Sequence, residues 1–185
     1  SPEAKNGFME RLALLQGSAP GSLGLPPSPD LLRDTGYVYN RVRQARLAGN
    51  LGGAIQLLST RPPATKPALN PTRWIGELLS AAKGAGAASA VRIAASVDDA
   101  FAPGTDVSSK SYKLRGDYTT LVWLGGTKAL WSLGDAAAAA PLFYRYGAAA
   151  KTPGTRAKGF YWAGRAASQA GDRAGANRYF ELAAA

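Results

Sequence analysis

The sequence has 185 residues, 46% of them hydrophobic, and its 22 basic and 12 acidic residues give a formal net charge of +10. A chain of this length can bury one sizeable core, so we expect one domain, with or without a short appendage. The chain contains neither cysteine nor histidine, which excludes disulfides, the usual zinc sites and every catalytic arrangement built on a thiolate or an imidazole.

The excess of positive charge favours polyanionic partners, such as nucleic acid, acidic lipid headgroups or a carboxylate-bearing cell-wall polymer. The basic residues are scattered, and their densest group, at positions 41, 43 and 46, is typical of a solvated face. Nucleic-acid binding would depend on charge alone, so we do not expect it, and no cofactor is predicted. No stretch approaches the roughly 18 consecutive apolar residues of a membrane span. The chain begins with Ser1-Pro2-Glu3 instead of Met, which indicates a trimmed fragment or a processed product.

The amino-terminal region, residues 1–29, is predicted to be an extension with a linker. Its first 17 residues carry apolar side chains at helical spacing, namely Phe8, Met9, Leu12 and Leu15, so we expect a short helix there. Residues 17–29 are dense in proline and glycine, which cannot continue a helix. The sequence therefore predicts a linker that precedes the main domain.

Residues 30–185 follow a different pattern of helix, tight turn and helix. Three of the turns share one form, in which a glycine is followed by Asn or Asp; they lie at residues 48–50, 133–135 and 170–172. Glycine can take the left-handed conformation that closes a helix, and the side-chain oxygen of Asn or Asp can cap the next helix. Each tripeptide thus predicts the end of one helix and the beginning of another.

The residues that follow these turns also repeat. An alanine stands five positions after each glycine and a large apolar residue nine positions after it, on one helical face: Ala54 and Leu58, Ala139 and Phe143, Ala176 and Phe180. Gly84, followed by Ile93, is a weaker fourth turn. The intervals from Gly49 to Gly84 and from Gly134 to Gly171 lie close to the period of about 34 residues of TPR-like hairpins, which stack to bury their apolar faces. We predict an all-α fold, an α-α superhelix of stacked TPR-like helical hairpins over residues 30–185.

The interval between the second and third of these four glycines is longer because it holds an insertion, residues 97–116, which we expect to be a loop. Asp98 and Asp99 are adjacent within it, so their carboxylates should point in different directions, at a helix end and a solvated loop. A metal ion would need more oxygen ligands than Asp106 adds, so no metal site is predicted.

Two further positions make local predictions about helix ends. Asp117 is expected to cap the helix that carries Leu121 and Leu130. Pro141 falls inside the helix that Asp135 opens, and proline lacks the N–H that a helix interior needs. We therefore predict either a kink at Pro141 or a helix that begins later than the turn suggests.

Four segments resemble the helical part of soluble lytic murein transglycosylases. They are residues 43–50, 71–75, 121–130 and, most specifically, 155–167, which contains the string Tyr-Trp-Ala-Gly-Arg-Ala-Ala. The likeness covers residues 35–185. It implies a periplasmic location and a superhelix of helical hairpins followed by a lysozyme-like domain. That domain cleaves the bond between N-acetylmuramic acid and N-acetylglucosamine and leaves a 1,6-anhydro product.

The residues that catalyse this reaction in the family are missing from the chain. In the family, the catalytic glutamate is followed by serine and lies upstream of a Gly-Leu-Met-Gln motif, and neither occurs here. Glu77 and Glu181 have no second carboxylate or histidine nearby in the sequence, so no catalytic residue is predicted. The resemblance implies the non-catalytic scaffold of such an enzyme, with peptidoglycan glycan strands, an absent carboxy-terminal catalytic domain and further proteins as its expected partners.

Aromatic residues are concentrated after residue 120, and most of them should belong to the core of the stacked hairpins. We expect a minority to line the inner wall, where rings stack on sugars and neighbouring cations face the carboxylates of peptidoglycan stems. The predicted substrate-binding residues are Arg145, Arg156, Lys158, Tyr161, Trp162 and Arg165. The alternative hypothesis is a stand-alone TPR-like interaction module that grips a peptide in its concave face.

Overall fold

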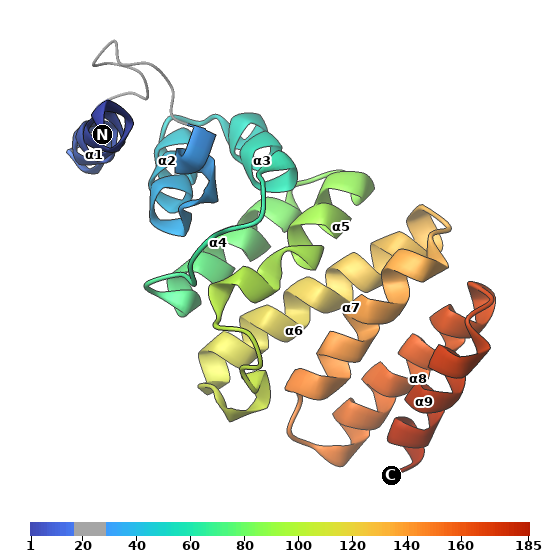
Figure 1. Ribbon diagram of the computed structural model, residues 1–185. Coiled ribbons are helices and arrows are strands. Elements are labelled where there is room, and N and C mark those ends of the chain that lie inside the picture. Colours follow the sequence, from blue (N-terminus) through green and yellow to red (C-terminus); the bar gives the residue numbers. More distant parts are fainter. Residues whose placement is uncertain (17–28) are drawn as a thin grey trace.

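The computed structural model describes residues 1–16 and 29–185, and this part of the chain is all-helical, as predicted (Figure 1). Its α-helices are α1 (Pro2–Leu15), α2 (Thr35–Leu47), α3 (Leu51–Thr60), α4 (Pro71–Lys83), α5 (Ala87–Ala95), α6 (Tyr112–Thr127), α7 (Ala136–Ala149), α8 (Pro153–Gln169) and α9 (Arg173–Ala184). Short helical segments are η1 (Pro29–Arg33), η2 (Val97–Ala100), η3 (Val107–Ser109) and the π-helical turn η4 (Lys128–Ser132). The predicted linker falls outside the described residues except at its last position.

The three glycine turns form as predicted. Gly49, Gly134 and Gly171 have φ angles of 76°, 64° and 83°, in the left-handed region. The side chains of Asn50, Asp135 and Asp172 accept hydrogen bonds from the backbone N–H groups three residues later, at 2.9, 3.0 and 2.9 Å. Local chemistry therefore fixes where α3, α7 and α9 begin. Gly84 also ends a helix, but its φ is −93°, and the next helix begins after Gly86 without a side-chain cap.

One predicted helix start was wrong, and at Pro141 one of the two predicted alternatives is excluded. The cap of α6 is Ser111, whose hydroxyl accepts from the N–H of Leu114 at 3.3 Å. Asp117 therefore lies within α6, where it pairs with Lys113 at 2.9 Å, and the predicted loop 97–116 is helical in its last five residues. Burial of Leu114 at the start of α6 explains the extension, since tertiary packing outweighs the local capping signal. The helix containing Pro141 begins directly after Asp135, so the later start is also wrong.

Glycines allow the last helices to approach closely. A Cβ atom at Gly159 of α8 would lie 2.6 Å from Cα of Gly147 in α7 and 2.9 Å from the carbonyl oxygen of Phe143. A Cβ atom at Gly164, inside the Tyr-Trp-Ala-Gly-Arg-Ala-Ala string, would lie 2.6 Å from the ring of Phe180 in α9. These glycines are needed because the backbone of one helix touches its neighbour.

In residues 1–16 and 29–185 the apolar core forms three clusters. The largest joins α2 to α7, the second joins η4 to α7, α8 and α9, and a small third cluster of Leu14, Leu31 and Tyr37 attaches α1. Consecutive helices lie side by side from α1 at one end of the molecule to α9 at the other (Figure 1). The apolar residues that predicted α1 point outward: Phe8, Leu12 and Leu15 are 60%, 38% and 66% exposed.

Candidate functional site

The six predicted substrate-binding residues separate into two groups. Lys158, Tyr161, Trp162 and Arg165 lie together on α8 with rings from α6, η4 and α7. We call the surface of Trp123, Trp131, Tyr146, Lys158, Tyr161, Trp162 and Arg165 the aromatic–cationic face. The other two predicted residues, Arg145 and Arg156, contact different parts of the molecule, described below.

One end of the aromatic–cationic face is a lysine above two rings. The ammonium of Lys158 lies 4.1 Å from the centroid of the Trp123 ring and 5.5 Å from that of Tyr146. The two rings themselves lie 4.9 Å apart. The negative faces of the rings attract the ammonium, so this contact holds an exposed cation in place.

The other end of the face is built on a buried phenylalanine. The Trp162 ring lies 6.3 Å from the fully buried Phe143 and meets Trp131 edge-on at 5.2 Å. Arg165 lies 5.8 Å from the rings of both Tyr161 and Trp162, and donates a hydrogen bond to the Tyr161 hydroxyl at 2.8 Å. The buried ring beneath holds a partly exposed aromatic surface in place.

The face has an available positive charge and exposed rings. Within residues 1–16 and 29–185, neither Lys158 nor Arg165 forms an ion pair. Trp131 is 58% exposed and Tyr161 is 41% exposed. Sequence reasoning did not select Trp123, Trp131 and Tyr146, because they lie on other helices and only the packing of α6 and α7 against α8 brings them to this surface. Their only sequence signal was their membership of the aromatic-rich region.

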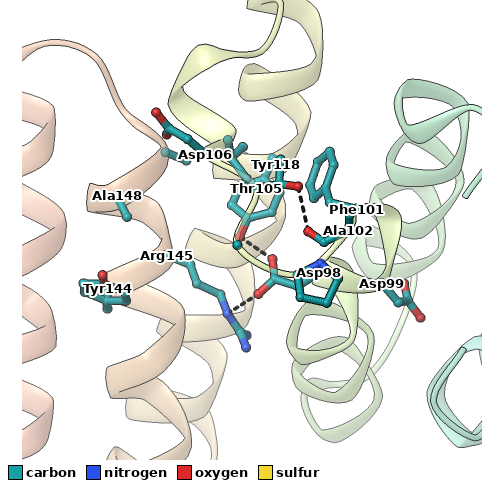
Figure 2. A pocket seen from close by; sticks show the side chains of 14 residues that line it. Asp98, Asp99, Phe101, Ala102, Thr105, Asp106, Tyr118, Tyr144, Arg145 and Ala148 are labelled. Atoms are coloured by element: carbon teal, nitrogen blue, oxygen red, sulfur yellow. Dashed lines mark hydrogen bonds and ion pairs between the residues drawn. The ribbon is translucent and has the colours of Figure 1, made fainter. Parts of the chain in front are cut away.

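A cavity of about 560 Å³ lies elsewhere, between residues 98–107 and α7, with Tyr118 of α6 also in its lining (Figure 2). Asp98 lies in this cavity. It accepts a hydrogen bond from the Tyr118 hydroxyl at 2.6 Å and forms an ion pair with Nε of Arg145 at 2.9 Å. Arg145 thus contacts a carboxylate of its own chain, and the expectation that it binds a ligand carboxylate stays a prediction. Burial and the neighbouring Asp98 carboxylate raise the pKa of Tyr118 well above its ordinary value, while Arg145 opposes the rise.

Asp99 makes a second set of polar contacts. It accepts from the indole N–H of Trp74 at 3.1 Å and forms an ion pair with Arg61. The Arg61 side chain is only 2% exposed; it donates to the hydroxyl of Ser96 at 2.9 Å and lies 4.9 Å from the Trp74 ring. The two adjacent carboxylates point in different directions, as predicted; Asp98 remains half exposed, whereas Asp99 is largely covered by its partners Arg61 and Trp74.

The remaining candidates support structure. Arg156 donates to the carbonyl oxygens of Ala148 and Ala150, at 3.4 and 2.9 Å, and so closes the connection between α7 and α8. Glu77 is bound by the guanidinium of Arg46, with contacts of 2.8 and 3.2 Å, and Glu181 is exposed on α9. In the described part of the chain, no three acidic side chains are grouped so that they could hold a metal ion.

Comparison with known proteins adds no relative. No protein-family model matches the chain, and neither the curated proteins nor the solved structures compared with it give a match. Among the helices of residues 1–16 and 29–185, none has both the length and the hydropathy needed to cross a bilayer.

Proposed function

We propose that the chain is the non-catalytic helical scaffold of a periplasmic lytic murein transglycosylase, and that its aromatic–cationic face binds peptidoglycan glycan strands. The observation that carries this proposal is the grouping of exposed rings and cations that form no ion pair among the described residues. The most specific part of the resemblance, residues 155–167, is the segment that supplies Lys158, Tyr161, Trp162 and Arg165.

The chemistry of the face suits a sugar polymer that carries carboxylates. Rings such as Trp131 and Trp162 present apolar surface on which the C–H face of a sugar can stack, while an indole N–H remains able to donate a hydrogen bond. Arg165 and Lys158 supply charge-assisted hydrogen bonds to carboxylates of the peptide stems. Because the rings already contact one another, little side-chain freedom is lost on binding.

The order of packing supports a TPR-like superhelix as the form of this scaffold. Helices α2, α4 and α6 contact one another in turn, and each also contacts the helix that follows it in the chain. Helices α6 and α7, and α8 and α9, form two further pairs, which are joined through the contact of α7 with α8. In TPR-like arrays such hairpins bury their apolar faces only against neighbouring hairpins. We propose that this stacking holds the aromatic–cationic face at a fixed place beside a catalytic domain.

The binding part of the proposal can be tested with purified glycan strands and muropeptides. Titration calorimetry should show association that weakens as salt is raised. Trp131→Ala and Lys158→Gln should each weaken binding about tenfold, because each removes a contact worth roughly 1–2 kcal/mol. Lys83→Gln is the matched control, since Lys83 is exposed at the end of α4 and lies outside the face. Salt-insensitive or undetectable association would remove the proposal, as would equal binding of an oligonucleotide.

A stand-alone interaction module is the second candidate, and the outer side of α1 favours it. Phe8, Leu12 and Leu15 follow one helical face and are all exposed, Leu12 the least. Such an apolar stripe is typical of a surface that docks another protein. The gene sequence downstream of this chain discriminates between the two candidates. A lysozyme-like segment with Glu-Ser supports the scaffold, whereas a stop codon supports the interaction module.

A further inference from the structure

The cavity beside α7 contains a carboxylate, of Asp98, and a guanidinium, of Arg145, that can each form further hydrogen bonds. The Asp98 side chain is 50% exposed, and each of its carboxylate oxygens accepts one bond, from Tyr118 and from Arg145. A carboxylate offers about four lone-pair sites, so about two remain. Arg145 uses Nε for Asp98 and Nη1 for the carbonyl oxygen of Ala95 at 3.4 Å, which leaves about three of its five N–H donors.

The surrounding contacts hold this pair in place before any ligand arrives. The Tyr118 hydroxyl fixes Asp98 from α6, and the next residue, Asp99, is anchored to Trp74 and the buried Arg61. The Thr105 hydroxyl donates to the carbonyl oxygen of Ala102 at 2.6 Å and closes the turn opposite α7 (Figure 2). A site held in this way loses little freedom when it binds.

The chemistry of the cavity selects a ligand with both charges. Asp98 and Arg145 carry opposite charges side by side, so the pair offers one contact to an ammonium and one to a carboxylate. The rest of the lining includes two more carboxylates, that of Asp99, which pairs with Arg61, and that of Asp106, which accepts from Ser108. It also includes apolar groups, among them Phe101, the exposed ring of Tyr144 and Ala148. The volume of about 560 Å³ lies in the ordinary range for small-molecule sites.

We propose that this cavity binds the zwitterionic headgroup of an α-amino acid, with the ammonium on Asp98, the carboxylate on Arg145 and an apolar side chain against Phe101 and Tyr144. The ammonium can donate to the spare acceptor sites of Asp98, and the carboxylate can accept from the spare donors of Arg145. This inference does not rest on the proposed glycan binding, since the cavity shares no residue with the aromatic–cationic face. Either proposal can therefore fail alone.

The first test uses the unaltered protein and three probes of similar shape. L-Phenylalanine carries both charges, phenethylamine lacks the carboxylate, and 3-phenylpropanoate lacks the ammonium. Titrations followed by amide chemical shifts should show L-phenylalanine binding at least about tenfold more tightly than either analogue, because each analogue forfeits a charge-assisted bond. The shifts should concentrate in residues 98–107 and 144–149. Equal binding of the three probes, or shifts centred elsewhere, would overturn the proposal.

Variants then test the two contacts. Asp98→Asn keeps an acceptor for Tyr118 but removes the charge, and Arg145→Gln removes the guanidinium; each should weaken L-phenylalanine binding at least about tenfold. Arg165→Gln, on the aromatic–cationic face, should leave it unchanged. If a variant fails to fold, the titrations of the unaltered protein with the three probes still test the proposal.

A final arm identifies the source of the headgroup. The same chemistry occurs in free amino acids and at the side-chain end of diaminopimelate within a peptide stem. Tighter binding of a diaminopimelate-containing tripeptide than of L-phenylalanine, again lost in Arg145→Gln, would assign the site to a peptide stem. The reverse order would assign it to free amino acids. Binding of neither would contradict the proposal.

Discussion

The last three helices and the region that connects α3 to α6 are held together by different contacts. Helices α7, α8 and α9 pack through glycine and alanine, and the backbones of α7 and α8 touch at Gly147 and Gly159. Between α3 and α6 the contacts include a polar network in which Asp99 binds Trp74 and the buried Arg61. The first region is therefore sensitive to an added atom, and the second to a lost charge.

The largest expected effect comes from breaking the polar network. Asp99→Ala leaves the Arg61 guanidinium buried without its counter-charge, and removes the acceptor of the Trp74 indole N–H. We expect a loss of about 3–5 kcal/mol of unfolding free energy, as for other buried pairs that lose one partner. Urea unfolding followed by circular dichroism measures this loss.

The matched control for that variant is Asp117→Ala. Asp117 pairs with Lys113, whose side chain is 73% exposed, so its removal should cost at most about 0.5 kcal/mol. Equal losses for Asp99→Ala and Asp117→Ala would mean that the buried network contributes nothing beyond a surface ion pair.

The next largest effect comes from adding one methyl group to the last helices. Gly159→Ala forces a Cβ atom against the backbone of Gly147, so α7 and α8 must move apart. We expect a loss of about 1–3 kcal/mol, the usual cost of overpacking. Gly154→Ala in the same helix meets no atom within 4 Å and should be neutral or stabilising by up to about 1 kcal/mol. A Gly159→Ala variant as stable as Gly154→Ala would refute the close approach.

A smaller effect should be the same in both regions. The caps Asn50 and Asp172 make the same bond, at 2.9 Å, to a backbone N–H three residues later. Asn50→Ala and Asp172→Ala should each cost about 1 kcal/mol, since a cap acts only on the first turn of its own helix. Thermal and urea unfolding of the two variants measure this. Values that differ by more than about 1 kcal/mol would show that the cap is coupled to the packing around it.

These caps also indicate which features the sequence could predict. The tripeptides around Gly49, Gly134 and Gly171 contain within three residues all the chemistry that ends one helix and begins the next, so their turns were predicted. The buried positions Ala54 and Ala139 followed from the same register. At Asp117 the same reasoning failed, because burial of Leu114 favours a helix that begins six residues earlier.

The candidate sites could be predicted only in part, for a related reason. The predicted residues of the aromatic–cationic face all lie on α8, and helical spacing alone brings them together: Lys158, Tyr161, Trp162 and Arg165. By contrast, Asp98 meets Tyr118 and Arg145 only after three segments pack together. Contacts between helices distant in sequence leave no periodic signal, so the cavity and the pairing of Arg145 with Asp98 were not predicted.

The smallest expected effect is the pH dependence of the unfolding free energy, which comes from Tyr118 in the polar region. Burial and Asp98 raise the folded-state pKa of Tyr118 above the ordinary value of 10.0. The unfolded chain therefore releases the tyrosine proton first, and the stability that neutral Tyr118 provides is present below pH 10 and lost as pH rises above it. The advantage of the wild type over Tyr118→Phe should shrink by about 0.8 kcal/mol between pH 8 and pH 10.5. Tyr112→Phe, at a ring that is 85% exposed, should follow the wild-type profile. Parallel profiles for all three proteins would mean that the folded structure does not keep the Tyr118 hydroxyl neutral.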